Sequence, residues 1–275
     1  MDYKTLQYEI RDHVGWLTLN RPEQHNAMSW EMILELRDFF GSLDDNLDVR
    51  VVVVRSAGKD FSTGLDLTTV PGFDASMAAQ GAPAQSFRPQ GFMIQRKLSD
   101  IAIRMRHAPQ PIIASVRGVA LGGGFAITLA SDIRLASETA RFNVGAPRIG
   151  ISAGETGISY FLPRLIGASR AALYMFTSRF IDAPTAERIG LVSQVVPDNK
   201  LDEATEELVR ELLKISPFAL RMTKEIFNAG VDSPSLEDTT KVENRTQLLC
   251  GLTADMIEAV KANFFEKRAP VYTDD

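Results

Sequence analysis

Three consecutive glycines, Gly122 to Gly124, lie between two apolar runs at residues 112–116 and 133–135. The β-branched residues of these runs predict buried strands, and the apolar residues after the glycines predict a short helix. Because glycine has no Cβ, a ligand can approach the backbone there. A helix that begins at this turn has free N–H groups at the positive end of its dipole. The pattern predicts a backbone site for a negatively charged oxygen; the structural alternative is a helix packed tightly against a neighbour.

The composition limits the functions that need to be considered. Apolar residues make up 45% of the 275 residues and charged residues 24%, as in ordinary globular proteins. The net charge of −5 and the lack of a long basic face argue against nucleic-acid or anionic-membrane binding. The three histidines are far apart and show no metal-ligand spacing, so we predict no metal site.

Cellular location is suggested by the single cysteine and by the N-terminal residues. Cys250 alone excludes an intramolecular disulfide and fits a reducing compartment. The N-terminus lacks the pattern of a signal or transit peptide, and no apolar stretch is long enough to span a bilayer. We therefore expect a cytoplasmic protein.

The elements that position the glycine turn follow from hydrophobic periodicity. We predict a hairpin over residues 8–20, a helix capped by Ser29 that ends near Gly41, and a strand over residues 49–55 whose four valines are buried on both faces. A long loop over residues 71–91 precedes a helix over residues 92–106.

The second half of the chain is predicted to be mainly helical. Residues 141–150 are expected to be irregular, and helices are expected over residues 152–166 and 167–177. A further helix is capped by Asp182, and a last strand covers residues 191–196. From residue 201 the pattern is helical throughout, so we divide the chain into a core, residues 1–200, and a C-terminal helical segment, residues 201–275.

Five motifs in chain order resemble the crotonase (enoyl-CoA hydratase/isomerase) superfamily. They are RPEQHNAM at 21–28, FSTGLDL at 61–67, GVALGGGFAITLASD at 118–132, ISYFLPRLIG at 158–167 and AERIGLVSQVV at 186–196. The resemblance implies an α/β fold with a crotonase-like core of turned ββα units and a C-terminal helical trimerisation segment. It also implies a lyase or isomerase of fatty acid metabolism with an acyl-CoA thioester as substrate. No cofactor beyond that CoA is expected, and the assembly is expected to be a homotrimer or homohexamer.

The resemblance also implies where the substrate binds. The thioester carbonyl oxygen would lie between the backbone N–H groups of Leu65 and Gly123, an arrangement that stabilises an enolate. Removing one such donor typically costs about 2.7–4 kcal/mol in the barrier. The substrate-binding residues implied by the resemblance are Gln24, His25, Ala27, Asp66, Gly122, Phe264 and Lys267, the last two from a neighbouring subunit.

Two of these implied assignments have structural alternatives. Asp66 also fits an N-cap for the turn that follows it. Phe264 and Lys267, in ANFFEKR, also fit the apolar face and solvated charges of a terminal helix.

The chain departs from the family pattern at two positions. A hydratase of this family carries two glutamates beside the bound water, and counting along the motifs places Ala126 and Ala146 there. Neither alanine can move a proton, although general acid–base catalysis contributes about 10²–10⁴-fold. The departure argues against ordinary enoyl-CoA hydration.

Glu155 is the replacement candidate for proton transfer. Aligned on the residues that follow it, Glu155 falls where dienoyl-CoA isomerases and an aryl-CoA dehalogenase of the family carry an aspartate. Ser152 and Glu155 equally fit an S-x-x-E capping box at the start of a helix. Such a carboxylate would have its charged form favoured by the helix dipole.

A competing motif spans Gly150 to Gly154, which matches the G-x-S-x-G nucleophile elbow of α/β-hydrolases. That fold requires a histidine after the serine in chain order, and none follows His107, so we reject this interpretation. Arg148, Asp74 and Arg88 are further ionisable residues near the expected acyl end.

Two functional hypotheses follow. The first is an acyl-CoA enzyme for which double-bond isomerisation is the easiest chemistry; hydration by Glu155, thioester hydrolysis and decarboxylation are alternatives at the same site. The second is a catalytically silent CoA-binding homologue, which the two alanines favour.

Overall fold

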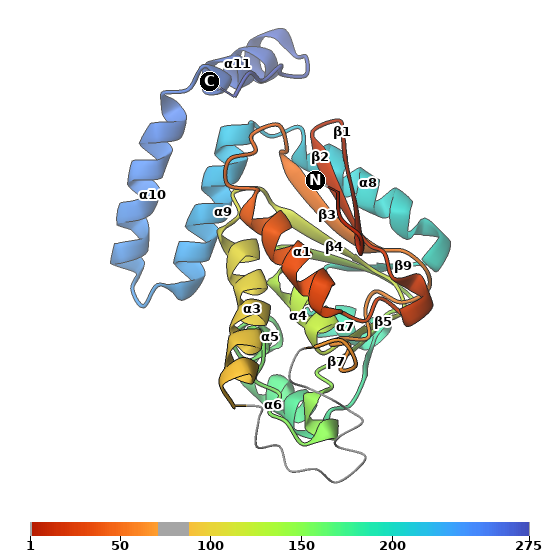
Figure 1. Cartoon of the computed structure of the whole chain (residues 1–275). Coiled ribbons are helices and arrows are strands. Elements are labelled where there is room, and N and C mark those ends of the chain that lie inside the picture. Colours follow the sequence, from red (N-terminus) through yellow and green to blue (C-terminus); the bar gives the residue numbers. More distant parts are fainter. Residues whose placement is uncertain (1, 71–87, 275) are drawn as a thin grey trace.

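The computed structural model describes residues 2–70 and 88–274 and shows a mixed α/β fold (Figure 1). Most of the predicted loop over residues 71–91, including Asp74, lies outside the described residues. The strands are β1 (Leu6–Arg11), β2 (Val14–Leu19), β3 (Val51–Ser56), β4 (Ile112–Val116), β5 (Val119–Leu121), β6 (Ile133–Ser137), β7 (Arg141–Asn143), β8 (Ile181–Asp182) and β9 (Gln194–Val196).

The helices surround the strands and continue into the C-terminal part of the chain. The α-helices are α1 (Trp30–Gly41), α3 (Arg88–His107), α4 (Gly123–Ala130), α5 (Ile158–Ile166), α6 (Ala168–Thr177), α7 (Ala183–Arg188), α8 (Leu201–Leu212), α9 (Pro217–Asp232), α10 (Leu236–Gly251) and α11 (Ala254–Val260). Short turns of other helix types are η1 (Pro22–Gln24), η2 (Ala146–Ile149), η3 (Asp198–Lys200) and η4 (Lys261–Glu266).

The larger sheet has the strand order β1-β2-β3-β4-β6-β9. Strands β1 and β2 form the predicted hairpin, and the remaining neighbours are parallel. Val52 and Val54 of β3 face the core cluster that contains α1, α3 and α4, whereas Val51 and Val53 face a second cluster that includes Val209 of α8. The prediction of a strand buried on both faces is confirmed.

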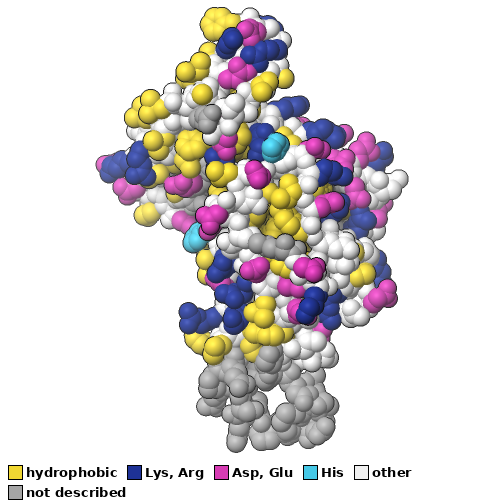
Figure 2. Space-filling view, turned by 45° about the horizontal axis from the view of Figure 1, so that its top comes forward, with side chains coloured by type: hydrophobic (Ala, Val, Ile, Leu, Met, Phe, Trp, Pro, Cys, Tyr) yellow, Lys and Arg dark blue, Asp and Glu magenta, His cyan; other side chains and the backbone are white. Residues whose placement is uncertain are grey.

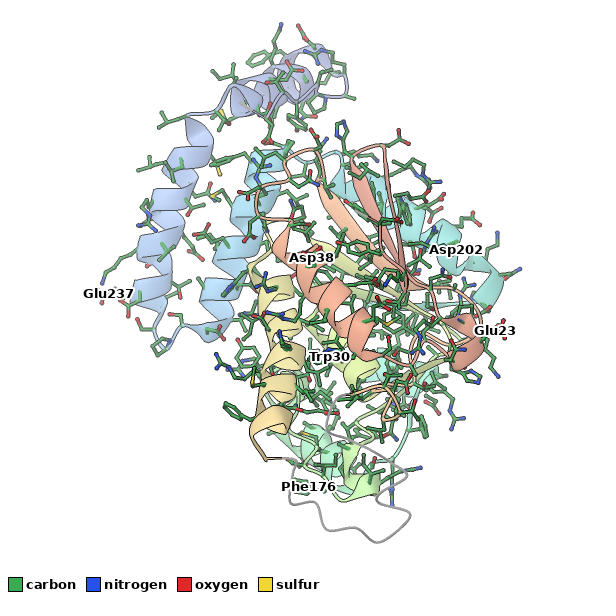
Figure 3. The ribbon with its side chains drawn as sticks, viewed as in Figure 1. Glu23, Trp30, Asp38, Phe176, Asp202 and Glu237 are labelled. Carbon is green, nitrogen blue, oxygen red and sulfur yellow. The ribbon has the colours of Figure 1, made fainter. Side chains whose placement is uncertain are left out.

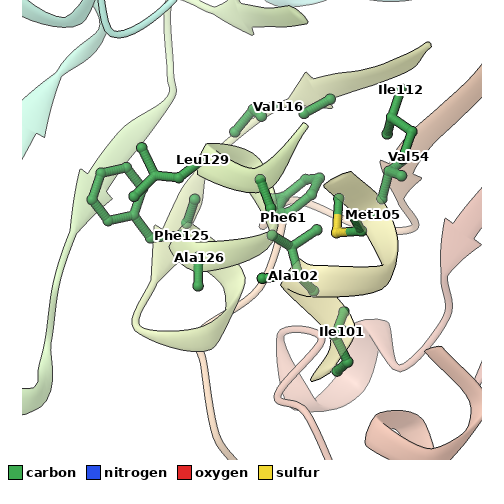
Figure 4. Packing of buried hydrophobic residues seen from close by; sticks show 14 of the residues in the cluster. Val54, Phe61, Ile101, Ala102, Met105, Ile112, Val116, Phe125, Ala126 and Leu129 are labelled. Carbon is green, nitrogen blue, oxygen red and sulfur yellow. The ribbon is translucent and has the colours of Figure 1, made fainter. Parts of the chain in front are cut away.

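Helix α4 lies in the centre of the main cluster, and every one of its residues is buried. Figure 4 shows Phe125, Ala126 and Leu129 of α4 beside Ala102 of α3 and Phe61, all within this cluster. Burial on all sides fixes the position of α4, because a closely packed interior allows little displacement.

Several local predictions are confirmed, and three boundaries are wrong. Ser29 and Asp182 cap their helices, each accepting a hydrogen bond from a backbone N–H three residues on. Helix α3 begins at residue 88 rather than 92, since a proline is tolerated in the first helical turn. The last strand covers only residues 194–196, and helix α5 begins at residue 158 rather than 152.

A small second sheet was missed in the sequence. Its order is β5-β7-β8, and Ala120 of β5 pairs with Phe142 of β7 in parallel. Residues 141–150 were expected to be irregular, but β7 covers 141–143 and η2 covers 146–149. A strand of three residues carries no readable period, so only its tertiary pairing defines it.

The C-terminal helices α10 and α11 extend away from the larger sheet (Figure 1). Large apolar side chains are exposed here, among them Leu248 of α10, Leu252 at its C-cap and Phe265 of η4, and apolar side chains recur over the upper part of the molecule in Figure 2. Within the described ranges, no helix combines the length and the apolar character that crossing a membrane requires.

Candidate functional site

The first predicted turn is held in place by a buried asparagine. The side-chain amide of Asn26 donates hydrogen bonds to the carbonyl oxygens of Ala57 and Asp60 at 2.8 and 2.9 Å. The Ser62 hydroxyl donates to the Asn26 carbonyl at 2.8 Å. Asn26 belongs to the RPEQHNAM motif but was not singled out in the sequence, because an isolated asparagine usually marks an exposed turn.

Leu65 lies at a backbone bridge to Met28. The Met28 N–H donates to the Gly64 carbonyl at 2.7 Å, and the Asp66 N–H donates to the Met28 carbonyl at 3.0 Å. These bonds use the backbone on either side of Leu65, so the Leu65 N–H points away from the bridge. In the described part of the chain it has no acceptor. The Leu65 N–H is therefore available to a ligand.

The second predicted turn presents the N-terminus of α4. Gly122 precedes the helix with φ +50°, and its N–H donates to the Asn143 carbonyl at 3.0 Å. The first intrahelical bond runs from the Ala126 N–H to the Gly122 carbonyl. The Gly123 N–H therefore belongs to the first helical turn and has no intrahelical acceptor.

The two turns pack directly against each other. The backbone of Ser62 forms hydrogen bonds of 2.9 Å with both Val119 and Leu121, just before the glycines. A Cβ on Gly124 would lie 2.6 Å from the Ser62 Cβ, a contact that side chains do not tolerate. Close packing, one of the two interpretations of the glycines, is thus confirmed. It also brings the free N–H groups of Leu65 and Gly123 onto adjoining turns.

Glu155 lies at the second turn. Its Oε1 atom is 3.5 Å from the position that a Cβ on Gly122 would occupy. The side chain is half-buried and, among the described residues, has neither a hydrogen bond nor an ion pair. Burial raises the pKa of the Glu155 carboxyl from 4.5 to about 7. A carboxyl with such a pKa can both accept and release a proton near neutral pH.

The predicted capping box is wrong. Helix α5 begins at Ile158, and the Ser152 hydroxyl instead accepts a hydrogen bond from the Gly154 N–H at 3.1 Å. Glu155 opens a tight turn in which the Ile158 N–H donates to the Glu155 carbonyl at 2.8 Å. The expected stabilisation of its charged form is also wrong, because loss of hydration dominates where no cap is formed.

The two alanines provide no polar group at this site. Ala126 is fully buried within the hydrophobic cluster around α4, and Ala146 at the start of η2 is only 7% exposed. Of these three candidates, Glu155 is thus the one that brings an ionisable group to the second turn.

The backbone of Gln24, His25 and Ala27 forms a compact turn. The Ala27 N–H donates to the Gln24 carbonyl at 2.9 Å, and the Thr63 N–H donates to the His25 carbonyl at 3.1 Å. The His25 ring nitrogen Nδ1 lies 2.9 Å from Asp60 Oδ2. The turn thus adjoins the Leu65 segment, and its CoA-binding role stays a prediction.

Asp66 has structural partners. Its carboxylate accepts hydrogen bonds from the Thr68 hydroxyl at 2.6 Å, the Thr68 N–H at 3.2 Å and Arg21 Nη1 at 3.0 Å. Burial acts to raise the pKa of Asp66, but these bonds outweigh it, and the pKa lies below its usual value. The turn-capping interpretation of Asp66 is confirmed, whereas contact with a ligand stays a prediction.

Phe264 and Lys267 lie at the opposite end of the molecule from the two turns. Phe264 is 71% exposed on η4, and the Lys267 amino group donates to the Asn263 carbonyl. Helix α11, which leads into η4, is well separated from α4 and α5 in Figure 1. Within one chain these two side chains do not reach the Glu155 site.

The remaining candidates lie outside this constellation or have other partners. Ser152 is exposed and follows a short 3₁₀ helix rather than a strand, so no nucleophile elbow is formed. The Arg148 guanidinium donates to the Ser178 carbonyl at 2.9 Å. His107 lines a cavity of about 430 Å³ between α3 and α9, which contains none of the predicted site residues.

One known protein family matches almost the whole chain. The family described as Enoyl-CoA hydratase/isomerase matches residues 9–275. The chain belongs to the enoyl-CoA hydratase/isomerase family. This membership confirms the predicted family and an enzyme of this type.

Individual relatives agree with the family assignment. The chain is 39% identical over 266 residues to a Mycobacterium bovis protein named "Probable enoyl-CoA hydratase echA12", covering 96% of this chain and 91% of that one. It is 30% identical to the Escherichia coli 1,2-epoxyphenylacetyl-CoA isomerase, covering 96% of each chain. The crystal structure of an enoyl-CoA hydratase from Bacillus anthracis superposes with a TM-score of 0.87 at 30% identity, covering 99% of this chain and 100% of that one. These matches confirm the crotonase-like α/β fold.

Proposed function

We propose that this family member binds an acyl-CoA thioester at the two turns and uses Glu155 to relocate a proton on the acyl group. The observation that carries the proposal is the half-buried Glu155 carboxyl, unpartnered in the described structure, beside Gly122. The thioester carbonyl oxygen accepts hydrogen bonds from the Leu65 and Gly123 N–H groups. No cofactor beyond the CoA of the substrate is needed.

One carboxylate is sufficient for double-bond isomerisation. Ionised Glu155 removes a proton from the carbon next to the thioester of a 3-enoyl-CoA, and the electron pair moves onto the carbonyl oxygen. The two backbone donors and the positive end of α4 stabilise this enolate. Protonated Glu155 then returns the proton to the fourth carbon, which leaves a 2-enoyl-CoA. A pKa of about 7 suits both halves of this cycle.

Hydration of a 2-enoyl-CoA requires two proton transfers. Water must lose a proton to become nucleophilic, and the carbon next to the thioester must gain one. Ala126 and Ala146 supply neither group, so Glu155 alone would serve both steps. The E. coli relative is named as the isomerase of an epoxide, which shows that the family includes isomerases, whereas the name of the M. bovis relative supports hydration. The alanines lead us to favour isomerisation.

Assembly into homotrimers or homohexamers forms part of the proposal. The exposed apolar side chains of the C-terminal helices, among them Leu252 and Phe265, favour burial against another subunit. In such an assembly Phe264 and Lys267 would contact the CoA nucleotide of a neighbour. A reducing, cytoplasmic location fits the single Cys250.

The test is a mass-resolved assay in D₂O with short and long 2- and 3-enoyl-CoA, dienoyl-CoA and β-ketoacyl-CoA thioesters, together with one thioester whose acyl group carries a free carboxylate. We expect isomerisation, with deuterium incorporated where protonated Glu155 exchanges with solvent before it returns the proton. We also expect a fall of at least about 10²-fold in Glu155→Gln with thioester binding retained. Glu23→Gln is the matched control, since Glu23 is an exposed acid on the short helix η1 (Figure 3).

Other products of this assay would identify the alternative reactions. Addition of water without isomerisation would replace the proposal by hydration. Release of free CoA would indicate hydrolysis, and loss of carbon dioxide from an acid-bearing acyl group would indicate decarboxylation. If every thioester binds and returns unchanged and undeuterated, the chain is the catalytically silent binder.

A further inference from the structure

A buried arginine binds the C-terminal end of the helix that presents Gly123. Arg134 Nη1 donates to the Ser131 carbonyl at 2.5 Å and to the Thr128 carbonyl at 3.4 Å, both at the end of α4. Arg134 Nε donates to the Leu191 carbonyl at 2.8 Å. One guanidinium on strand β6 thus joins the end of α4 to the segment before β9.

The environment of Arg134 is unusual for a cation. The residue is 7% exposed, and in the described structure its side-chain hydrogen bonds all go to backbone carbonyls. In the described ranges it forms no ion pair. Burial lowers the pKa of Arg134 to about 10, with partial opposition from the Asp132 carboxylate, so the charge persists at neutral pH. Burying a charge without an ion pair costs free energy, because the charge loses its hydration. The groups that Arg134 contacts therefore show which part of the molecule its charge stabilises.

Arg134 stabilises the C-terminal end of α4, which is the negative end of the helix dipole. The helix has 8 residues, so its two ends are only about 12 Å apart. In so short a buried helix, the partial negative charge of the last carbonyls weakens the positive potential at the first N–H groups. A cation bound to those carbonyls neutralises this opposing charge.

We propose that Arg134 is a positioning residue for the oxyanion site, acting through α4. Its hydrogen bonds fix the axial position of the helix, and its charge strengthens the potential at the Gly123 N–H. Arg134 does not touch the substrate. The inference rests on the proposed function, since it concerns the same carbonyl-binding turn.

Infrared spectroscopy of a bound, unreactive thioester tests this role directly. The probe is the tightest binder among butyryl-, octanoyl- and phenylacetyl-CoA, labelled with ¹³C at the thioester carbonyl. Donation from Leu65 and Gly123 should lower the carbonyl stretching frequency in the native protein. The variants are Arg134→Gln, which removes the charge, and Arg134→Lys, which retains it with fewer donors. Each spectrum reports on bound, folded molecules only, so reduced yield does not obscure the result.

Lys224→Met is the matched control. Lys224 on α9 is also a buried cation, 6% exposed, and its amino group binds the Met105 and Gln110 carbonyls and the Asp132 carboxylate. In the described ranges it donates to no carbonyl of α4 or of its Ser131 cap, and its ion pair is with Asp132, one residue beyond that cap. Its loss should lower stability and leave the carbonyl frequency unchanged.

We expect Arg134→Gln to lose most of the frequency shift and at least about tenfold in kcat, with KM little changed. Arg134→Lys should retain an intermediate shift. If the native protein shows the shift and Arg134→Gln keeps all of it, the role of Arg134 is overturned while the oxyanion site stands. If the native protein itself shows no shift, the proposed oxyanion site fails. An equal loss of shift in Lys224→Met would reduce Arg134 to a general stabilising residue.

Discussion

Replacing Glu155 by glutamine should make the protein more stable, and the gain should depend on pH. The pKa of Glu155 is about 7 in the folded protein and 4.5 in the reference state, a difference of about 2.5 units. At about 1.36 kcal/mol per unit, ionisation in the folded site costs about 3 kcal/mol. Glutamine keeps the shape of the side chain and carries no charge.

The pH dependence of this stability gain follows from the linkage between folding and protonation. Below pH 4.5 the carboxyl is protonated in both the folded and the unfolded chain, so the native protein and Glu155→Gln should be similarly stable. Between pH 4.5 and about 7 only the unfolded chain ionises, and the free energy of unfolding of the native protein falls. Above about pH 7 the advantage of Glu155→Gln should level off near 3 kcal/mol.

Urea unfolding at a series of pH values from 4 to 8.5, at fixed protein concentration, measures this difference. Glu23→Gln provides the baseline for losing an exposed carboxylate. A stability difference that stays constant across this range, or a Glu155→Gln variant less stable than the native protein at pH 8, would refute the argument. Either result would mean that Glu155 is well hydrated or paired, which would also remove the basis for its role as a base.

Three further outcomes are expected. Log kcat/KM should rise with unit slope below about pH 7 and level off above it, and the residual activity of Glu155→Gln should lack this inflection. Asn26→Ala should lower the free energy of unfolding by about 2–4 kcal/mol in urea titrations, because the buried Asp60 carbonyl and the part-buried Ala57 carbonyl lose their donor. Gly124→Ala should lower turnover by at least about 10²-fold, because its Cβ would force Ser62 and the first turn away from α4. Gly251→Ala, whose Cβ meets no atom within 4 Å, should leave turnover unchanged.

Local chemistry explains which elements could be predicted. The Ser29 and Asp182 caps depend on neighbours within a few residues, and the run of four valines indicates a strand buried on both faces through residue type alone. Each was predicted correctly. The β7 strand could not be predicted, since its residues form a strand only by pairing with β5. Helix α5 was placed too early because Ser152 and Glu155 match a cap motif whose spacing alone does not define the backbone.

The chemical groups of the site follow from residue types alone. The glycines leave room for backbone donors, Ala126 and Ala146 carry no ionisable group, and the motifs identify the family. These properties depend on the chemistry of the side chains and not on how the chain is folded.

The pKa values and contacts of those groups depend instead on the packing of distant parts of the chain. Glu155 lies beside Gly122, 33 positions earlier in the chain, and its raised pKa comes from the hydration that this packing removes. Arg134 binds the end of α4 because β6 returns beneath that helix. Desolvation and hydrogen-bond geometry depend on neighbours that are distant in sequence, so they appear only when the chain is folded.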